Sequence, residues 1–140
     1  MTENKTSGSC LCGEVTYQYV GSIKIFQYCH CSRCQKFTGS AYASNIIIDP
    51  TQFQWLSGES SLGRFELPEA KYFATTFCTK CGSSLPWLTQ AGGAIVIPTG
   101  TLDDDPKEKP VHNIFMAEKA PWFEEVCNLK QYEALPVKED

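Results

Sequence analysis

Seven of the eight cysteines in this 140-residue chain lie in three short groups. The groups are an N-terminal pair (Cys10 and Cys12), a triplet (Cys29, Cys31 and Cys34) and a C-terminal pair (Cys78 and Cys81) that Gly82 follows directly. Zinc in proteins is tetrahedral, and a closed structural site takes four thiolate or imidazole ligands. Seven sulfurs divide naturally into four plus three. The pattern therefore predicts one saturated zinc site and a second site with an open coordination position, as zinc enzymes have.

Disulfide bonds are the alternative explanation for clustered cysteines, and the rest of the sequence disfavours them. Disulfide-rich scaffolds are secreted, whereas residues 1–9 are polar and contain no apolar signal-peptide core. Cysteines separated by a single residue also fit the strict geometry of a disulfide poorly. No apolar run approaches the roughly 18 residues of a membrane span. We therefore expect metal-binding thiols in a cytoplasmic protein without a membrane segment.

The spacing within each group suits one metal ion. In Cys-x-x-Cys the chain turns back so that both sulfurs face the same ion, and Gly82 favours such a turn because glycine reaches positive φ at little cost. In Cys-x-Cys the two sulfurs lie on the same side of an extended chain. Two divisions into four and three remain open. Cys31 and Cys34 could join the C-terminal pair in a ribbon-like site, or the two pairs could combine and leave the triplet intact, which loop-closure entropy favours.

Charge and length narrow the class of protein. The formal net charge is −4, and zinc bound by thiolates leaves a protein acidic. Because nucleic-acid-binding domains usually carry a basic patch, we expect no nucleic-acid partner. The length predicts a single zinc-binding domain over residues 1–140, with its core at about 8–135. The oligomeric state is left open.

The hydrophobic pattern predicts an all-β protein of short, mainly antiparallel strands. The expected strands are 14–19, 43–48, 53–56, 62–65, 71–77, 85–88 and 94–97. Gly92 and Gly93 predict a hairpin turn between the last two. Helix signals are few: residues 32–37 could form a short helix capped by Ser32, with Gly39 beyond its end. The turns between strands carry the cysteine groups.

Three segments resemble the glutathione-dependent formaldehyde-activating enzyme (GFA) family. They are Ser-Cys-Leu-Cys-Gly-Glu-Val-Thr-Tyr (9–17), Tyr-Cys-His-Cys-Ser-Arg-Cys-Gln-Lys-Phe-Thr-Gly-Ser (28–40) and Phe-Cys-Thr-Lys-Cys-Gly-Ser-Ser-Leu (77–85). Residues 100–103, 112–115 and 119–123 also resemble the family, so the likeness covers about 8–135. One departure is Asn113, which separates His112 from Ile114 where the family pattern runs directly from histidine to the Ile-Phe pair.

The resemblance implies an Mss4-like fold and up to two zinc ions per chain. It implies that Cys10, Cys12, Cys78 and Cys81 hold a structural zinc, and that Cys29, Cys31 and Cys34 hold a second, exchangeable zinc at the catalytic position. The implied activity is that of a carbon–sulfur lyase, which adds glutathione to formaldehyde and forms S-(hydroxymethyl)glutathione. The partners are then glutathione or another small thiol and formaldehyde or another small aldehyde.

This chemistry suits a three-thiolate site. A free thiol has a pKa near 8.5 and is mostly protonated at neutral pH, while the thiolate is the nucleophile. Zinc with an open position can deprotonate a bound thiol or polarise the aldehyde oxygen. Three thiolates reduce its Lewis acidity, so thiol capture is favoured. Two alternatives remain: a non-catalytic zinc- or thiol-binding module on a structural scaffold, and a four-cysteine site that holds iron.

The two histidines and the eighth cysteine have structural interpretations. His30 lies between two expected ligands and should point to the opposite face, so we expect it to pack behind the site rather than bind the metal. His112 is expected to be a structural histidine with its hydrogen bonds satisfied. Cys127 stands alone in a polar segment and is expected to be a half-buried thiol.

Basic and aromatic side chains could complete a binding pocket. The basic residues beside the expected ligands are Arg33, Lys36 and Lys80. They could contact the carboxylates of glutathione or be ordinary surface charges. The three tryptophans are Trp55, Trp87 and Trp122. We expect them in the core, where one could also wall the pocket.

Overall fold

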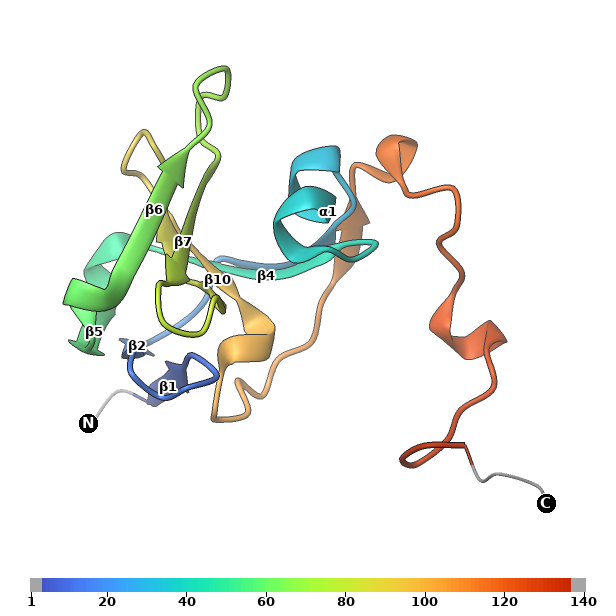
Figure 1. Ribbon diagram of the computed structural model, residues 1–140, viewed down its shortest axis with the longest axis horizontal. Helices are drawn as coiled ribbons and strands as arrows, with labels where there is room; N and C mark the ends of the chain where they lie inside the picture. Colours follow the sequence, from blue (N-terminus) through green and yellow to red (C-terminus); the bar gives the residue numbers. More distant parts are fainter. Residues whose placement is uncertain (1–3, 137–140) are drawn as a thin grey trace.

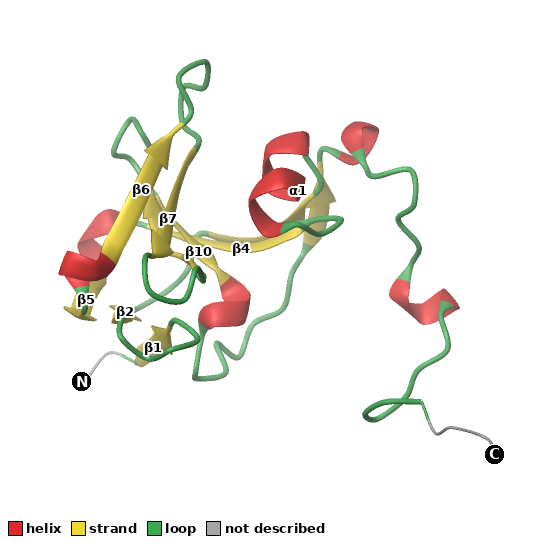
Figure 2. Cartoon of the chain, viewed as in Figure 1, coloured by secondary structure: helices red, strands yellow, loops and turns green. Residues whose placement is uncertain are grey.

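The computed structural model describes residues 4–136, and in this range strands dominate (Figures 1 and 2). The strands are β1 Lys5–Ser9, β2 Thr16–Val20, β3 Ile25–Cys29, β4 Ala43–Ile48, β5 Phe53–Ser57, β6 Leu62–Glu66, β7 Ala74–Cys78, β8 Ser84–Leu85, β9 Trp87–Leu88, β10 Ile95–Pro98 and β11 His112–Ile114. One α-helix, α1, spans Ser32–Thr38. Short 3₁₀ turns occupy Pro50–Gln52, Glu59–Ser61, Thr99–Thr101, Met116–Glu118 and Val126–Asn128. The prediction of an all-β protein with only short helical turns is confirmed.

The described strands form three sheets. Their orders are β1-β2-β5, β11-β3-β4-β10-β9 and β6-β7-β8. All pairings are antiparallel except that of β11 with β3, which is parallel. Figure 1 shows the β6–β7 hairpin standing beside β10, and α1 lying over β4. The five-stranded sheet is therefore covered by α1 on part of one face.

The two faces of the five-stranded sheet pack differently: one forms the main core and the other carries part of the cysteine triplet. Residues directly opposite each other on paired strands share a face. One face carries the main core, which includes Phe26, Ile46, Ile48, Ile95 and Ile97. The other face is formed by residues that are paired in the register of the strands: Cys29–Ala43, Gln27–Asn45, Ile47–Val96 and Val96–Trp87. Strand alternation thus places part of the cysteine triplet on the face opposite the main core.

The N-cap of helix α1 lies one residue earlier than the sequence predicts. Cys31, rather than Ser32, is the N-cap: its Sγ accepts a hydrogen bond from the backbone N–H of Cys34 over 3.3 Å. The expected C-terminal signal is correct, because Gly39 has φ 65° and its N–H donates to the carbonyl of Gln35. A left-handed residue that ends a helix is most often glycine. The helix therefore starts at a sulfur of the triplet.

Several strand boundaries differ from the prediction. The strand 43–48 is correct, but the expected strand 85–88 divides at Pro86 into β8 and β9, and the expected strand 71–77 begins only at Ala74. Pro86 has no N–H to continue a ladder. The strands β1, β3 and β11 were not predicted. Their segments are short, and β11 finds its partner far away in the sequence.

After β11 the chain leaves the sheets and runs along the outside (Figure 1). Phe123 still packs against the rings of His30 and Tyr42, but every described residue after it is exposed. Two predictions are wrong here: Trp122 is 67% exposed rather than in the core, and Cys127 is exposed rather than half-buried. The reason is the same for both, since this segment has no sheet to pack against. No helix in the described residues has the length and apolar character needed to cross a bilayer.

Candidate metal centres

The two cysteine pairs meet in one cluster, which we call the four-cysteine cluster (Cys10, Cys12, Cys78 and Cys81). The N-terminal pair lies in the turn after β1, and the C-terminal pair lies where β7 ends. All four sulfurs lie within 4.8 Å of one another, with Sγ–Sγ distances of 3.6 Å for Cys10–Cys12 and 3.8 Å for Cys12–Cys78. Four sulfurs about 2.3 Å from a tetrahedral zinc lie about 3.8 Å apart. The spacing fits a zinc ion, and all described cysteines are free thiols.

Hydrogen bonds point at the sulfurs of this cluster. The N–H of Val15 donates to Cys10 Sγ over 3.3 Å, and the Ser83 hydroxyl lies 3.2 Å from Cys81 Sγ. Hydrogen bonding by Ser83, through its side chain and then its backbone, lowers the pKa of Cys81 to about 5. Gly82 adopts φ 79°, the positive φ that was predicted for the turn after Cys81. The pKa of Cys10 is lowered as well, so these contacts favour the thiolate forms of Cys10 and Cys81, whereas the pKa of Cys12 is raised.

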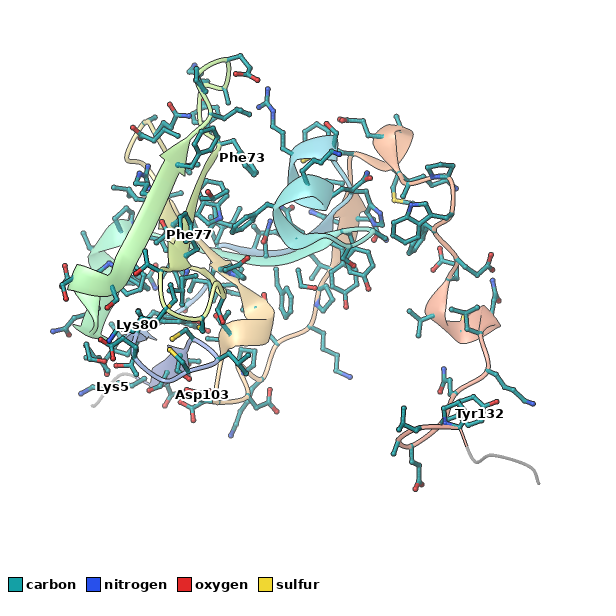
Figure 3. The ribbon with its side chains drawn as sticks, in the orientation of Figure 1. Lys5, Phe73, Phe77, Lys80, Asp103 and Tyr132 are labelled. Atoms are coloured by element: carbon teal, nitrogen blue, oxygen red, sulfur yellow. The ribbon has the colours of Figure 1, made fainter. Side chains whose placement is uncertain are left out.

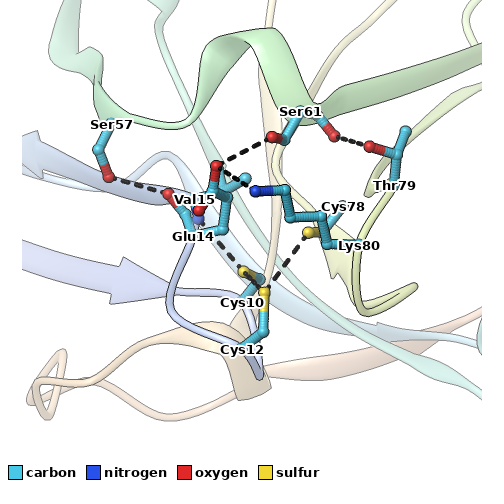
Figure 4. A network of polar contacts seen from close by, with 9 residues as sticks. All are labelled: Cys10, Cys12, Glu14, Val15, Ser57, Ser61, Cys78, Thr79 and Lys80. Atoms are coloured by element: carbon cyan, nitrogen blue, oxygen red, sulfur yellow. Dashed lines mark hydrogen bonds and ion pairs between the residues drawn. The ribbon is translucent and has the colours of Figure 1, made fainter.

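An ion pair braces the two turns that carry the four-cysteine cluster (Figure 4). Lys80 Nζ lies 3.0 Å from Glu14 Oε1, and the Ser61 hydroxyl donates to the same oxygen over 3.1 Å. Thr79 in turn donates to the carbonyl of Ser61. The hydrogen bond from Lys80 is the main reason that the pKa of Glu14 is lowered. Of the two uses considered for Lys80, the structure therefore supports a structural charge rather than a substrate contact.

The triplet forms a separate cluster, which we call the three-cysteine cluster (Cys29, Cys31 and Cys34). Cys29 ends β3, Cys31 caps α1 and Cys34 lies in the first turn of the helix. Their sulfurs lie within 4.8 Å of one another. Hydrogen bonds from Cys29 and then Cys34 lower the pKa of Cys31 to about 2, while the pKa values of Cys29 and Cys34 are raised. Three sulfur donors this close together can bind one cation, which would hold them as thiolates.

The structure distinguishes the two divisions that the sequence left open. It brings the two pairs together and leaves the triplet intact, whereas the ribbon-like combination of Cys31 and Cys34 with the C-terminal pair is not formed. In the described residues these two groups are the ones that could hold a metal ion. The donor sets fit one four-ligand and one three-ligand site.

His30 packs behind the three-cysteine cluster. Its side chain is fully buried, and its Nε2 donates to Asn113 Oδ1 over 3.0 Å. The ring packs against those of Tyr42 and Phe123, with centroids 5.0 and 5.1 Å away, and these two rings also contact each other. The His30 carbonyl accepts from Gln35 Nε2 over 2.8 Å. As predicted, His30 is a packing residue and is not part of the sulfur cluster.

The partners of the histidines were not found from the sequence. Asn113, seen only as a departure from the family pattern, supplies the acceptor for His30. His112 is exposed and bonds Gln27 Oε1 over 2.8 Å, so its polar group is satisfied but at the surface. Both contacts follow from the parallel pairing of β11 with β3, which places Asn113 beside Tyr28 and His112 beside Gln27. A local pattern carries no signal for this pairing.

A cavity of about 600 Å³ adjoins the three-cysteine cluster. Its floor is the face of the five-stranded sheet opposite the main core, and it includes Asn45, Ile47, Trp87 and Val96. Phe73 lines it from the segment before β7, on the side of the hairpin that faces α1 (Figure 3). Trp87, predicted as a core tryptophan that could wall a pocket, is both buried and part of the lining. Trp55 is half-buried and packs against the main core, away from this cavity.

The basic residues considered for substrate contact lie in different parts of the structure, and not all of them line the cavity. Arg33 and Lys71 lie in the cavity lining, and both side chains are exposed. Lys36 lines a neighbouring groove of about 640 Å³ together with Phe37 and Phe65. Of the three residues singled out from the sequence, only Arg33 reaches the cavity, and Lys71 was missed because it lies far from every cysteine in the sequence.

Together, the three sheets and the two cysteine clusters define a small all-β protein with two candidate zinc centres, consistent with the Mss4-like fold. A family model described as "Glutathione-dependent formaldehyde-activating enzyme" matches residues 5–118. The chain therefore belongs to the GFA family.

Two further comparisons add to this. The chain resembles a crystal structure of a Rhodobacter sphaeroides protein from structural genomics, with a TM-score of 0.57 and 18% identity over 76% of this chain and 98% of that chain. At this identity the likeness concerns the fold. No functionally curated protein matches the sequence significantly.

Proposed function

We propose that this protein joins glutathione, or a similar small thiol, to formaldehyde or another small aldehyde, and that the reaction takes place at the three-cysteine cluster. Membership of the GFA family supports the reaction class. The observation that carries the proposal is the position of the cluster: its three sulfurs border a cavity of about 600 Å³. The four-cysteine cluster would hold a structural zinc and take no part in the chemistry.

Cys29, Cys31 and Cys34 would hold the second zinc, with one coordination position left for substrate. A zinc ion bound there supplies a site at which a thiol is held in its nucleophilic, deprotonated form. The chain's own contribution is binding and orientation. Arg33 and Lys71 attract the carboxylates of the thiol, and the sheet floor excludes water from the reacting atoms. Holding two small reactants together in this way accelerates their addition.

The acidic residue in the described cavity lining is Glu118. Its side chain is exposed, and its Oε1 accepts a hydrogen bond from the Ser32 N–H over 3.2 Å. This contact fixes the start of α1 and so the position of Cys31. The described lining holds no histidine and no second carboxylate, which favours a second candidate function, a thiol-binding or carrier module. The addition of thiols to aldehydes also proceeds without an enzyme.

Exchange measurements distinguish the two functions. The zinc-loaded protein, at catalytic concentration, should accelerate exchange between free formaldehyde and its glutathione adduct, seen as faster magnetisation transfer by NMR. The Cys31→Ser variant measures the uncatalysed rate. Glutathione should bind, and S-methylglutathione should bind poorly because a thioether cannot ionise. Binding without accelerated exchange would favour the carrier function, and equal affinity for the thioether would overturn thiol capture.

We further infer a reducing, cytoplasmic location and a single-domain organisation. All described cysteines are free thiols, as expected where disulfides are kept reduced. The two clusters share one set of sheets, which supports one domain. Non-reducing mass spectrometry of protein trapped in cells with a thiol-alkylating reagent should show every cysteine modified or metal-protected. Disulfide-linked peptides in that sample would contradict the location.

A further inference from the structure

We propose that the cavity beside the three-cysteine cluster selects aldehydes that carry an apolar group, aromatic or branched alkyl, over formaldehyde itself. This inference rests on the proposed thiol–aldehyde addition and names the aldehyde class for the same site. The substrate pair is then an anionic thiol and an apolar aldehyde. In the addition, the sulfur forms a bond to the carbonyl carbon, the C=O π pair moves to oxygen, and the thiol proton ends on that oxygen as a hydroxyl.

The length of the cavity floor exceeds what a one-carbon aldehyde needs. The floor crosses the sheet from Cys29 on β3, over Asn45 and Ile47 on β4 and Val96 on β10, to Trp87 on β9. Neighbouring strands lie about 4.8 Å apart, so three steps from β3 to β9 span about 14 Å. Formaldehyde bound at the sulfurs would occupy only the first part of this floor.

The far part of the floor is apolar. Val96 and Trp87 are 6% and 7% exposed, and Ile47 and Phe73 pack against them in one cluster. Phe73 stacks at a tilt on Trp87, with ring centroids 5.3 Å apart. Each methylene that a ligand buries on such a surface improves binding by about fourfold. These neighbours already cover most of Val96 and Trp87, but the part that lines the cavity is apolar. An alkyl or phenyl substituent can contact it, whereas formaldehyde carries no such group.

Charge places the two substrates in opposite parts of the cavity. Arg33 and Lys71 are exposed, and in the part of the chain that the structure describes neither forms an ion pair. They can meet the carboxylates of the thiol in contact with water. A carboxylate over Ile47 or Val96 would instead lose its hydration without a partner, which is costly. The apolar floor is thus left to the aldehyde.

Asn45 provides a polar contact at the boundary between the two parts. It is 9% exposed, lies in the floor opposite Gln27 in the register of β3 and β4, and its amide makes no hydrogen bond with any described residue. The amide is not fully shut off from solvent, so it can bind a ligand in the cavity. The aldehyde oxygen, or the hydroxyl of the adduct, fits this role: the Asn45 NH₂ can donate to it while the substituent extends toward Trp87.

The test measures catalysed exchange with glutathione for formaldehyde, 3-methylbutanal and benzaldehyde, each divided by its own uncatalysed rate. We expect the two apolar aldehydes to exceed formaldehyde by tenfold or more. Trp87→Leu should remove that advantage, so that the two apolar aldehydes no longer exceed formaldehyde. The matched control is Trp122→Leu, the same substitution at an exposed tryptophan. Should Trp87→Leu fail to fold, Phe73→Leu at a half-buried position replaces it.

A binding readout is independent of turnover. Benzyl alcohol carries the phenyl group of benzaldehyde and cannot form the adduct, so saturation transfer from the protein to its ring protons reports occupancy of the floor. We expect transfer in the wild type and Trp122→Leu, and its loss in Trp87→Leu. Acceleration for formaldehyde alone would overturn the aldehyde class and leave the proposed function intact. Thiol binding with no acceleration for any aldehyde would overturn the proposed function, and this inference with it.

Discussion

The two cysteine clusters use the same ligand atoms for different tasks, and the difference lies in how far apart in the chain their members are. Cys12 and Cys78, which meet in the four-cysteine cluster, are separated by 66 positions. The three-cysteine cluster is drawn from six consecutive residues at the junction of β3 and α1. A metal in the first cluster closes a long loop, whereas a metal in the second adds little to a turn already held by backbone hydrogen bonds.

The surroundings of the two clusters also differ in a way that fits a structural role for one and a chemical role for the other. Cys10 and Cys78 belong to the main core, and hydrogen bonds and an ion pair surround their cluster on the protein side. The three-cysteine cluster borders a cavity that a small molecule can enter. A saturated ligand set suits a structural metal, and an incomplete set beside a cavity suits chemistry. The comparison teaches that position in the fold, rather than ligand type, separates the two roles.

The largest expected effect is the loss of the fold when the four-cysteine cluster is broken. Cys78→Ser or Cys10→Ser should give insoluble or unfolded protein, because the binding energy of a structural metal is also folding energy. Circular dichroism and solubility after expression measure this. The control is Cys127→Ser, at an exposed thiol outside both clusters, which should change stability by less than about 0.5 kcal/mol. A soluble, folded Cys78→Ser protein would break the comparison.

A smaller effect is expected when the three-cysteine cluster is broken. Cys34→Ser should leave a folded protein that holds one zinc per chain and no longer binds thiols. In the wild type, mild chelation should remove zinc from this cluster first, because a site with an exchangeable position releases metal more readily. Metal analysis against chelator concentration measures both. Equal resistance of the two ions in the wild type would contradict the division of roles.

Much of this comparison could be predicted from the sequence because the cysteine motifs are local. Cys-x-Cys and Cys-x-x-Cys bring sulfurs together by the geometry of a few residues, and Gly39 follows the end of α1 as predicted. The number of cysteines predicts four plus three, but their spacing leaves open which cysteines form each set, and the family resemblance implies the division that the fold forms. Only the approach of the turn after β1 to the end of β7 joins the two pairs.

The cavity could not be predicted for the same reason. Its floor takes alternate residues from several strands, so that Asn45, Val96 and Trp87 become neighbours only through register. Tryptophan identity was no guide, since Trp87 is buried in the floor and Trp122 is exposed. Burial depends on whether a segment has a sheet to pack against, and the chain after Phe123 has none in the described residues.

A substitution behind one cluster should affect that cluster alone. Asn113→Ala removes the acceptor for the buried His30 Nε2, and an unsatisfied buried donor costs about 1–3 kcal/mol. Since His30 lies between Cys29 and Cys31, zinc affinity at the three-cysteine cluster should fall while the four-cysteine cluster is unchanged. Competitive chelator titration measures the two affinities. His112→Ala, at the exposed neighbour on β11, is the control, and an equal loss there would contradict a specific role for Asn113.

The smallest expected effect concerns the brace of the four-cysteine cluster. Lys80→Met removes the ion pair with Glu14 but keeps the aliphatic part of the side chain, so the turn between Cys78 and Cys81 loses one tether. Because exposed ion pairs contribute little, the protein should fold, and zinc should leave the four-cysteine cluster only slightly faster under strong chelation. Release from the three-cysteine cluster should not change. Lys24→Met, which breaks the exposed pair with Asp49 and leaves the pair at the four-cysteine cluster intact, is the matched control. If Lys80→Met instead accelerated release from the three-cysteine cluster, the two centres would be coupled through the sheets, and their roles would no longer be separable by position.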